Sequence, residues 1–359
     1  MSQSNAAIIL PRRLAIRRKL RSWRFVISLA TIGLTLLCLE AATHLLIPED
    51  EWITRPHPTT DDNLLGYKLK PNLTVEAVKK KNGEVVYDVT YSTDEYGRRI
   101  TPVEKRQNRI RSILFFGCSY TFGEGVQDNE TLPFYVSQVA SQYRVYNYGV
   151  EGYGPQHMLA KLQKRELPGE ISGRDGATLV FTFIDHHIAR VMGWMQTLPW
   201  GSHFPYYVMD GADRLVYKGN FISGRPLLSK LYVLMWKSRL VQYLDTRLHL
   251  PKVNEENIRL TAKIIEESRN VFRETFHSEN FYILFHPNGS GEYAKRLIPY
   301  LKRAGIKYLD YSDIADEAIR DKIPNDSHPS SKSYRAVALK LAQDIGIAPD
   351  AAETLTDRN

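Results

Sequence analysis

From residue 111 onward, short apolar runs alternate with longer segments of helical periodicity, and this alternation limits the possible folds more than any other feature. The apolar runs are SILFFG (112–117), RVYNYG (144–149), ATLVFTFI (177–184), NFYILFH (280–286) and IKYLDY (306–311). Near-continuous apolar strands separated by helices are typical of a parallel sheet covered on both faces. We therefore predict an α/β fold with three layers, in which functional residues gather at the carboxyl ends of the strands.

Residues 186–250 interrupt this alternation. The interval is rich in aromatic side chains, as in WMQTLPWGSHFPYYVMD and LLSKLYVLMWKSRLVQYL, and shows no clear pairing of a strand with a helix. A long insertion after a central strand often forms a lid or a substrate-binding element. Its apolar helix could instead pack on the domain or on a membrane surface, and the pattern leaves both possibilities open.

A different pattern precedes the apolar runs. Between Tyr67 and Arg99, apolar and polar residues alternate, and Asn82-Gly83 separates two of the alternating runs. Asn-Gly in this setting predicts a β-hairpin. We expect a small β extension here, with residues 79–81 at a solvent-exposed edge and turn.

The excess positive charge of the chain is concentrated at its N-terminus. The formal net charge is +8, and seven basic residues precede the first acidic one, Glu40: they are Arg12, Arg13, Arg17, Arg18, Lys19, Arg21 and Arg24. Without them, 41 basic residues stand against 40 acidic residues. The charge therefore indicates a basic N-terminal arm, and it does not indicate a nucleic-acid-binding surface.

The basic arm leads into an apolar segment, FVISLATIGLTLLCLEAATHLLI, at residues 25–47. A helix of this length rises about 1.5 Å per residue and spans roughly 34 Å, against a bilayer core of about 30 Å. Glu40 and His44 lie near its C-terminal end, where they can reach the membrane interface. The segment is therefore long enough and apolar enough to cross a membrane.

Three interpretations of this segment compete. A cleaved signal peptide is disfavoured because no A-x-A-type cleavage site follows cleanly, and a lipoprotein signal is disfavoured because Leu37 precedes Cys38. We therefore predict an uncleaved single-span anchor. The basic flank places the N-terminus in the cytoplasm and the rest of the chain outside it, which in a bacterium is the periplasmic side of the inner membrane.

Ser119 follows the first apolar run, in the stretch ILFFGCSYTFGEGV. A serine at this place is either a turn residue or a nucleophile. The neighbouring Cys118 is a second candidate nucleophile, although a buried cysteine is more often a small apolar filler. Cys38 lies inside the apolar segment and cannot plausibly pair with Cys118, so no disulfide framework is expected.

Polar residues and glycines also stand at other predicted strand ends and before the last helix. They are Asn147 and Gly152 in NYGVEGYG, Asp185, His186 and His187 in IDHHIAR, and Asp326 and His328 in PNDSHPSS. A serine hydroxyl needs an adjacent imidazole to take its proton, and the imidazole needs a partner that holds one tautomer. Glycines allow backbone N–H groups to approach the oxyanion that forms during acyl transfer. Asp326 and His328 are two residues apart, so both side chains can point the same way from an extended loop.

The stretches FFGCSYTFGEGV, NYGVEGYG and NDSHPS resemble the sequence blocks of SGNH (GDSL-type) hydrolases over roughly residues 110–345. The resemblance implies a flavodoxin-like parallel sheet and a cofactor-independent mechanism. It implies a catalytic set of Ser119, His328 and Asp326, with the N–H groups of Ser119 and Gly152 at the oxyanion. LLGYKLKPN and STDEYGRR also look like the N-terminal extension of membrane-anchored bacterial members.

The chain departs from this family at the third block, where an asparagine side chain should face the oxyanion. FIDHH stands there instead. The carboxylate of Asp185 would repel an oxyanion unless it were protonated. His186 or His187 could donate instead, and we expect His187 to be the third donor.

Two alternatives concern the same residues. Asn325 stands three residues before His328, but both spacings occur in proteins of this type, and we expect Asp326 to orient the imidazole. The DHH stretch could combine with Asp326 and His328 to bind a metal such as zinc. That arrangement would leave Ser119 without a role, so no metal is expected.

These features predict a membrane-anchored serine esterase or acyltransferase that acts on O-acylated substrates outside the cytoplasm. Acetylated envelope or exported polysaccharide is a common theme among related anchored proteins, so an O-acetylated glycan is the expected substrate. A lipid or small-ester hydrolase and a non-catalytic glycan-binding or assembly protein are the alternatives. The expected organisation is a cytoplasmic arm (1–24), a membrane span (25–47), a linker with the β extension (48–109), a hydrolase-like domain (110–346) with its insertion (186–250), and a C-terminal tail (347–359).

Overall fold

The computed structural model describes residues 9–46, 51–102, 110–173, 176–248 and 251–347. The expected tail therefore lies outside the described residues except for Ile347, as do the first eight residues of the expected cytoplasmic arm. The chain divides into two compact units, Met1–Pro48 with Lys237–Leu248 and Glu49–Trp236 with His249–Asn359. The segment Lys237–Leu248, which we expected inside the insertion, thus groups with the N-terminal helix.

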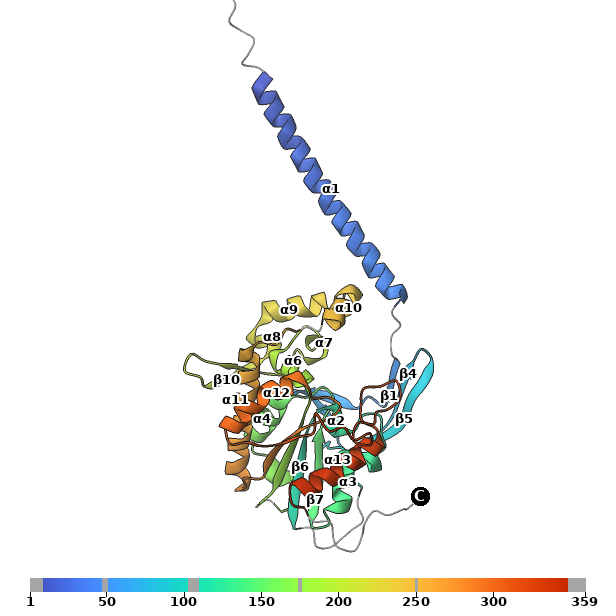
Figure 1. Cartoon of the computed structure of the whole chain (residues 1–359), viewed down its shortest axis with the longest axis vertical. Helices are drawn as coiled ribbons and strands as arrows, with labels where there is room; N and C mark the ends of the chain where they lie inside the picture. The colour runs from blue at the N-terminus through green and yellow to red at the C-terminus, as the bar shows by residue number, and fades with distance from the viewer. Residues whose placement is uncertain (1–8, 47–50, 103–109, 174–175, 249–250, 348–359) are drawn as a thin grey trace, which may run out of the picture. The chain divides into compact units, whose positions relative to one another are not determined.

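The larger unit is built on a five-stranded parallel sheet (Figure 1). Its strands are β6 (Arg111–Gly117), β7 (Tyr143–Gly149), β8 (Thr178–Phe183), β11 (Phe281–Phe285) and β12 (Lys307–Asp310). They lie in the order β12-β11-β8-β6-β7, and every neighbouring pair is parallel. This is the flavodoxin-like order, and each predicted apolar run is a strand of the sheet, so the predicted fold class is confirmed.

Successive residues of the inner strand β6 point to opposite faces of the sheet and enter two separate apolar cores. Ile113 and Phe115 pack in one core, and Leu114 and Phe116 pack in the other. The first core is covered by α3 (Leu132–Val139) and α13 (Ser331–Asp344), and the second by α4 (Pro155–Gln163), α11 (Glu255–Phe276) and α12 (Glu292–Arg303). Full burial of an aliphatic or phenylalanine side chain contributes roughly 1.5–3 kcal/mol, so both faces must be covered for the sheet to be stable.

The predicted β extension is present and packs against the first core. It contains β1 (Glu51–Arg55), β4 (Thr74–Lys81) and β5 (Glu84–Ser92) as an antiparallel sheet, and β2 (Thr59–Asp62) with β3 (Gly66–Leu69) as a separate hairpin. Asn82 and Gly83 join β4 to β5 with φ values of 54° and 83°. Positive φ at both positions is typical of a type I′ hairpin turn, which confirms the hairpin prediction.

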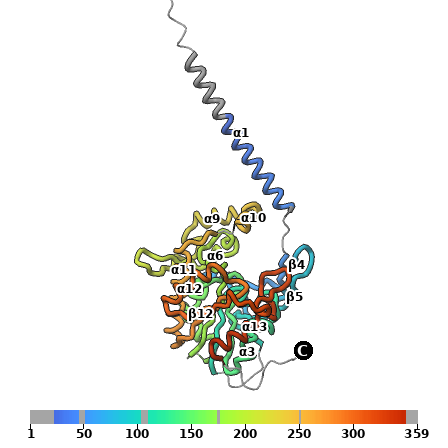
Figure 2. The backbone as a smooth tube through the Cα atoms, viewed as in Figure 1, coloured from blue at the N-terminus to red at the C-terminus, as the bar shows by residue number. Residues whose placement is uncertain are grey.

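The interval 186–250 contains helices and one β-hairpin (Figure 2). Its elements in the larger unit are α6 (His186–Met192), α7 (Leu198–Gly201), β9 (Pro205–Met209), β10 (Leu215–Asn220), α8 (Phe221–Gly224) and α9 (Pro226–Met235). Strands β9 and β10 pair with each other and remain separate from the parallel sheet. Short segments α2 (Ser119–Phe122), η1 (Asp128–Glu130) and α5 (Leu167–Glu170) complete the larger unit.

The smaller unit consists of α1 (Ile9–Leu46) and α10 (Arg239–Leu248). Within α1, Trp23–Leu45 is long and apolar enough to cross a membrane, as a signal sequence or as an anchor. The carboxylate of Glu40 accepts hydrogen bonds from the Ser238 hydroxyl at 2.6 Å and from the N–H groups of Arg239 and Leu240 at 2.7 and 3.0 Å. Glu40 therefore caps the first turn of α10, which gives this acidic residue of the apolar helix a partner.

Candidate active site

Ser119 stands at a sharp turn between the inner strand β6 and the short helix α2. Gly117 ends the strand with φ 153°, and a Cβ at this position would collide with the side chain of Thr121. The turn therefore requires glycine. Cys118 is fully buried and packs with Tyr120 and Ile184, as expected for an apolar filler.

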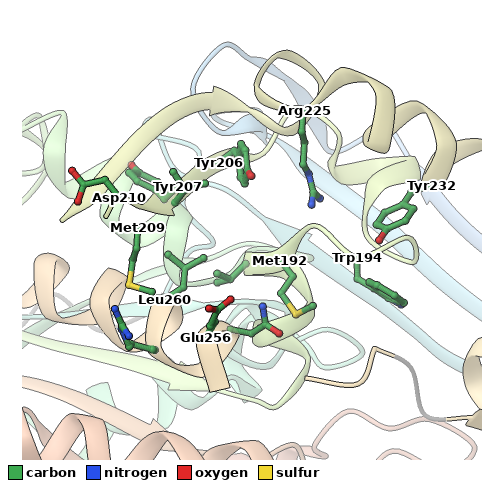
Figure 3. Close-up of a pocket in the computed structure, with 14 residues that line it drawn as sticks. Met192, Trp194, Tyr206, Tyr207, Met209, Asp210, Arg225, Tyr232, Glu256 and Leu260 are labelled. Carbon is green, nitrogen blue, oxygen red and sulfur yellow. The ribbon is translucent and has the colours of Figure 1, made fainter. Parts of the chain in front are cut away.

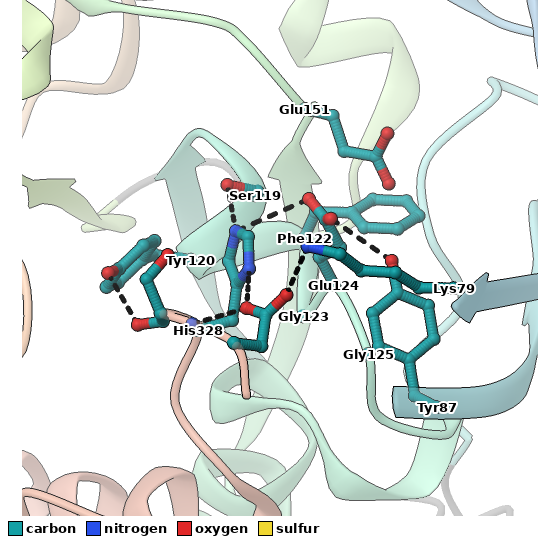
Figure 4. Close-up of polar contacts among 12 residues, drawn as sticks. Lys79, Tyr87, Ser119, Tyr120, Phe122, Gly123, Glu124, Gly125, Glu151 and His328 are labelled. Atoms are coloured by element: carbon teal, nitrogen blue, oxygen red, sulfur yellow. Dashed lines mark hydrogen bonds and ion pairs between the residues drawn. The ribbon is translucent and has the colours of Figure 1, made fainter. Parts of the chain in front are cut away.

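The loop before α13 brings His328 to this turn (Figure 4), together with Asp326. The Ser119 Oγ lies 2.9 Å from His328 Nε2, and His328 Nδ1 lies 2.6 Å from Asp326 Oδ1. Asp326 Oδ1 also accepts the backbone N–H of His328 at 2.7 Å, which holds the two side chains together. With Nδ1–H donated to the carboxylate, the lone pair of Nε2 is free to accept the serine proton.

The second carboxylate oxygen of Asp326 is paired with Lys79 of the β extension. Lys79 Nζ lies 2.8 Å from Asp326 Oδ2 and 4.2 Å from the centre of the Trp52 ring, and both members of the ion pair are almost completely buried. Burial raises the pKa of Asp326, but the hydrogen bonds and charges of His328 and Lys79 outweigh it and hold the pKa well below its usual range. Asp326 is therefore a carboxylate in this site.

Lys79 was expected at an exposed edge, and this expectation is wrong. The burial pattern of β4 places Lys79 on the same face as Val75 and Ala77, which point into the core. Side chains two residues apart share a face of a strand, so the spacing of Val75, Ala77 and Lys79 in β4 already indicated that Lys79 points inward. A lysine in a core-facing row needs a buried acidic partner, and that partner is Asp326.

A second carboxylate, Glu124, also reaches the imidazole. Glu124 Oε2 lies 3.3 Å from His328 Nε2, and Glu124 Oε1 accepts the hydroxyl of Tyr87 at 3.2 Å. Desolvation lowers the pKa of His328, but the charges of Glu124, Asp326 and Glu151 outweigh it and raise the pKa above its usual value. We did not predict Glu124, because nothing in the stretch FGEGV distinguishes it from a solvent-exposed turn residue.

Glu151 is the third carboxyl group near the imidazole. It directly precedes Gly152, and its own backbone oxygen accepts the hydroxyl of Tyr67 at 2.6 Å. Burial and then the negative charge of Glu124 raise the pKa of Glu151 to about 8. Glu151 therefore loses its proton less readily than an exposed glutamate does.

The loop that carries Glu124 is held by the β extension. The guanidinium of Arg99 donates to the backbone oxygens of Phe122, Gly123 and Val126 at 2.5–2.8 Å, and the N–H of Gly125 donates to the Tyr91 hydroxyl at 2.8 Å. Arg99 Nε also contacts Asp128 at 3.0 Å. The extension thus fixes the backbone that follows Ser119.

Gly152 lies in the loop three residues after the end of β7 and has φ 80°, a conformation that favours glycine. A Cβ there would also collide with Tyr67 and Trp200. Within the described part of the chain, the N–H of Gly152 has no recorded acceptor, and the N–H of Ser119 is in the first turn of α2, where no intrahelical acceptor exists. Both N–H groups are therefore available to a bound group.

Comparison with known proteins gives structural matches only. No protein-family model and no curated protein matches the chain. Its structural neighbours are esterases of the SGNH and GDSL types. They include a putative lipolytic protein of the G-D-S-L family from Desulfitobacterium hafniense DCB-2, with 14% identity and a TM-score of 0.35 over 65% of this chain and 98% of that chain.

Two further neighbours are named as esterases. The psychrotrophic esterase EstA from Pseudoalteromonas sp. is 10% identical, with a TM-score of 0.37 over 66% of this chain and 96% of that chain. The acetyl xylan esterase Est2A from Butyrivibrio proteoclasticus is 12% identical, with a TM-score of 0.37 over 82% of this chain and 88% of that chain. At these identities the similarity concerns the fold.

The structure places His187, the expected third oxyanion donor, among buried aromatic side chains. Its ring is fully buried, packs 5.2 and 5.4 Å from the rings of Phe181 and Phe183, and accepts the N–H of Ile184 through Nδ1 at 3.2 Å. Burial first and nearby positive charges second hold the pKa of His187 well below its usual value. This side chain packs as part of the core, and its role as an oxyanion donor stays a prediction.

The two residues before His187 have different roles. Asp185 accepts the backbone N–H groups of Tyr293 and Ala294 at 3.2 and 3.0 Å, so its carboxylate caps the first turn of α12. His186 begins α6 and is exposed. Among the described residues, no group of three or more His, Cys, Asp or Glu side chains is placed to hold a metal ion.

Proposed function

We propose that this chain is a serine esterase or acyltransferase in which Ser119 is the nucleophile, His328 the general base and Asp326 the orienting carboxylate. The observation that carries the proposal is the continuous chain of contacts from Ser119 Oγ to His328 Nε2 at 2.9 Å and from His328 Nδ1 to Asp326 Oδ1 at 2.6 Å. A serine becomes a nucleophile at neutral pH when a positioned imidazole accepts its proton.

In the first half-reaction, Ser119 Oγ attacks the ester carbonyl and its proton passes to His328 Nε2. The developing oxyanion is stabilised by the N–H groups of Ser119 and Gly152. Asp326 and Glu124 stabilise the imidazolium that forms. The tetrahedral intermediate then breaks its bond to the alcohol oxygen, which takes the proton from Nε2, and the acyl group remains on Ser119.

The second half-reaction reverses the proton movement. Water or a sugar hydroxyl gives its proton to His328 Nε2 and attacks the acyl carbon. The bond to Ser119 Oγ breaks, and the proton returns to the serine. Water yields a free acid, whereas a sugar hydroxyl yields a new ester, so the same residues support hydrolysis and transfer.

The proposed substrate class is O-acylated glycan outside the cytoplasm, with an acetyl group as the acyl unit. Two features support this part of the proposal. The basic N-terminal arm and the apolar segment Trp23–Leu45 fit an N-terminal membrane anchor with the larger unit in the periplasm. The aromatic side chains of the insertion offer flat apolar surfaces that suit sugar rings.

Turnover of 4-nitrophenyl acetate by the full-length protein in detergent tests the mechanism. We expect Ser119→Ala to lower kcat by at least about 10³-fold, because the nucleophile is lost. Cys118→Ala is the matched control at the adjacent side chain and tests the alternative nucleophile. A phosphonate ester should add its phosphonyl group to wild type and to Cys118→Ala, located on Ser119 by mass spectrometry.

The possible results separate the two candidate nucleophiles. Equal turnover by wild type and Ser119→Ala would contradict the proposed mechanism. Loss of labelling in Cys118→Ala, with labelling kept in Ser119→Ala, would assign the chemistry to the cysteine.

A further inference from the structure

A pocket of about 400 Å³ lies in the larger unit and does not include Ser119 or His328 among its lining residues (Figure 3). The insertion supplies one part of its wall, through α6, β9 and α9, and the N-terminal end of α11 supplies another. The aromatic residues of the wall are Trp194, Tyr206, Tyr207 and Tyr232. Its volume is within the range of small-molecule sites, which is about 300–1,000 Å³.

Arg225 extends into this pocket between Tyr206 and Tyr232 (Figure 3). One guanidinium nitrogen, Nη2, donates to the backbone oxygen of Gly193, and the buried Nε has no hydrogen-bond partner. The guanidinium carbon lies 5.3 Å from the centre of the Tyr206 ring. Among the described residues no carboxylate pairs with Arg225, so the pocket holds a cation that lacks an anionic partner.

The position of Arg225 is fixed by its surroundings. Its guanidinium also stacks 4.6 Å from the centre of the buried Phe221 ring. Gly193 has φ 56°, and a Cβ there would collide with both Arg225 and Phe221. Desolvation lowers the pKa of the guanidinium, so an anion that entered the pocket would relieve an unfavourable charge.

The other polar groups of the pocket suit hydroxyl groups. Glu256 and Asn257 stand at the start of α11, and Asp210, which pairs with Arg214, follows β9. Arg259 also lines the pocket and pairs with Asp213. Carboxylate and amide oxygens accept hydrogen bonds from hydroxyls, and aromatic rings pack on the apolar faces of sugar rings. Arginine binds a carboxylate through two parallel hydrogen bonds. The wall therefore combines surfaces for a sugar ring, for its hydroxyls and for one carboxylate.

Helix α6 connects this pocket to the candidate active site. It begins at His186, two residues after Ile184, which packs with Cys118 and Tyr120 beside Ser119, and it ends at Met192, which lines the pocket. Arg190 Nη1 donates to the backbone oxygen of Tyr153, the residue after Gly152, at 2.8 Å. Six residue steps of helix cover roughly 9 Å, a distance that a short oligosaccharide spans and a small ester does not.

We propose that this pocket is a binding subsite for a carboxylate-bearing sugar unit of the acylated glycan, with Arg225 as the carboxylate ligand. The proposal rests on the proposed function, since it assumes that the glycan extends from Ser119 along α6. It assigns a substrate class, namely an acidic O-acylated polysaccharide. It also gives the aromatic insertion a role in binding a part of the substrate that does not react.

Binding of defined oligosaccharides to the full-length protein in detergent tests this subsite. Calorimetry with oligogalacturonate of four to six units, compared with neutral cello-oligosaccharides of equal length, should show tighter binding of the acidic series. Arg225→Met should weaken oligogalacturonate binding by about ten- to a hundred-fold, because one bidentate charged contact is lost. Arg225→Lys keeps the positive charge but cannot make two parallel hydrogen bonds to a carboxylate. Its affinity for oligogalacturonate should therefore lie between those of Arg225→Met and wild type.

Arg303→Met is the matched control. Arg303 is an exposed arginine that also lies 5.3 Å from a tyrosine ring, that of Tyr300, but it is on α12 and away from the pocket wall. Its loss should leave oligogalacturonate affinity unchanged. Thermal unfolding of each variant checks that the proteins compared are folded, and the wild-type comparison of acidic with neutral ligands remains decisive even if Arg225→Met does not fold.

The outcomes separate this proposal from the esterase proposal. Equal wild-type affinities for acidic and neutral oligosaccharides, or equal losses in Arg225→Met and Arg303→Met, would overturn the subsite while leaving ester turnover intact. Acidic-ligand binding that depends on Arg225 in a protein without ester turnover would support the pocket and overturn the esterase mechanism.

Discussion

At the scale of single residues, His328 lies between two carboxylates with different consequences. Asp326 on Nδ1 favours the tautomer that can accept the proton of Ser119. Glu124, 3.3 Å from Nε2, is an acceptor for the protonated ring and therefore competes with Ser119 for that nitrogen. In the proposed mechanism, protonated His328 cannot act as a base, so Glu124 stabilises the inactive, protonated state of His328 at low pH. The same carboxylate stabilises the imidazolium that forms during the reaction.

We predict that Glu124→Gln shifts the acidic limb of the kcat/KM profile to lower pH. The carboxylate raises the pKa of His328, so its removal lowers that pKa and leaves the base neutral at more acidic pH. The measurement is turnover of 4-nitrophenyl acetate across the pH range. An unchanged or raised apparent pKa would show that Glu124 does not act on His328.

Lys79→Met provides the opposite test. Loss of the cation beside Asp326 leaves the Asp326–His328 pair more negative, which raises the pKa of His328 and moves the acidic limb to higher pH. Because the two variants change the local charge in opposite directions, a general loosening of the site would not produce this pair of shifts. Shifts of the same sign in both variants would contradict the electrostatic explanation.

At the scale of elements, the β extension completes the candidate site. Lys79 on β4 contacts Asp326, Tyr87 on β5 contacts Glu124, and Tyr91 on β5 accepts the N–H of Gly125. Arg99 follows these strands and donates to three backbone oxygens of the loop after Ser119. The extension therefore positions candidate catalytic groups that the parallel sheet alone would not hold.

We predict that Arg99→Met lowers the free energy of unfolding by roughly 3–5 kcal/mol. The change leaves buried carbonyl oxygens without their donor and removes the charged partner of Asp128. Urea denaturation measures the loss. The rate of phosphonate labelling at Ser119 should also fall, because the loop after the nucleophile loses its support.

Arg98→Met is the matched control for this prediction. Arg98 is also buried and donates to Asp94, to the Tyr148 hydroxyl and to the backbone oxygen of Glu170, but it makes no recorded contact with the loop after Ser119. Its loss should reduce stability while leaving the labelling rate of folded protein near that of wild type. Equal reductions in labelling rate would show that Arg99 acts only through global stability.

At the scale of the whole molecule, the seven basic residues before Glu40 predict the orientation of the chain in a membrane. We expect alkaline phosphatase fused to the C-terminus of the full chain to be active in a bacterial host, because that enzyme requires the oxidising periplasm. The intact mass of the purified protein should include the N-terminal helix. A mass lacking this helix would identify a cleaved signal sequence, and an inactive fusion would contradict the orientation.

Much of the fold could be predicted because its signals are local. The inner strands β6, β8 and β11 are near-continuous apolar runs, since both of their faces are buried, and the Asn82-Gly83 turn requires positive φ at both positions. Ser119, Asp326 and His328 were named from short stretches, and the structure brings them within hydrogen-bond distance. Their catalytic role stays a prediction.

The remaining features depend on which side chains the tertiary structure brings together. The sequence by itself determined the strands, the apolar helix, the hairpin and the three candidate catalytic residues, because each of these features depends on residues that lie close together in the chain. Only the tertiary structure decided that Lys79 meets Asp326, 247 positions away, that Glu124 faces His328, and that His187 belongs to the core. The alternation along a strand shows which side chains turn inward, but the partners they meet there are set by the packing of distant segments.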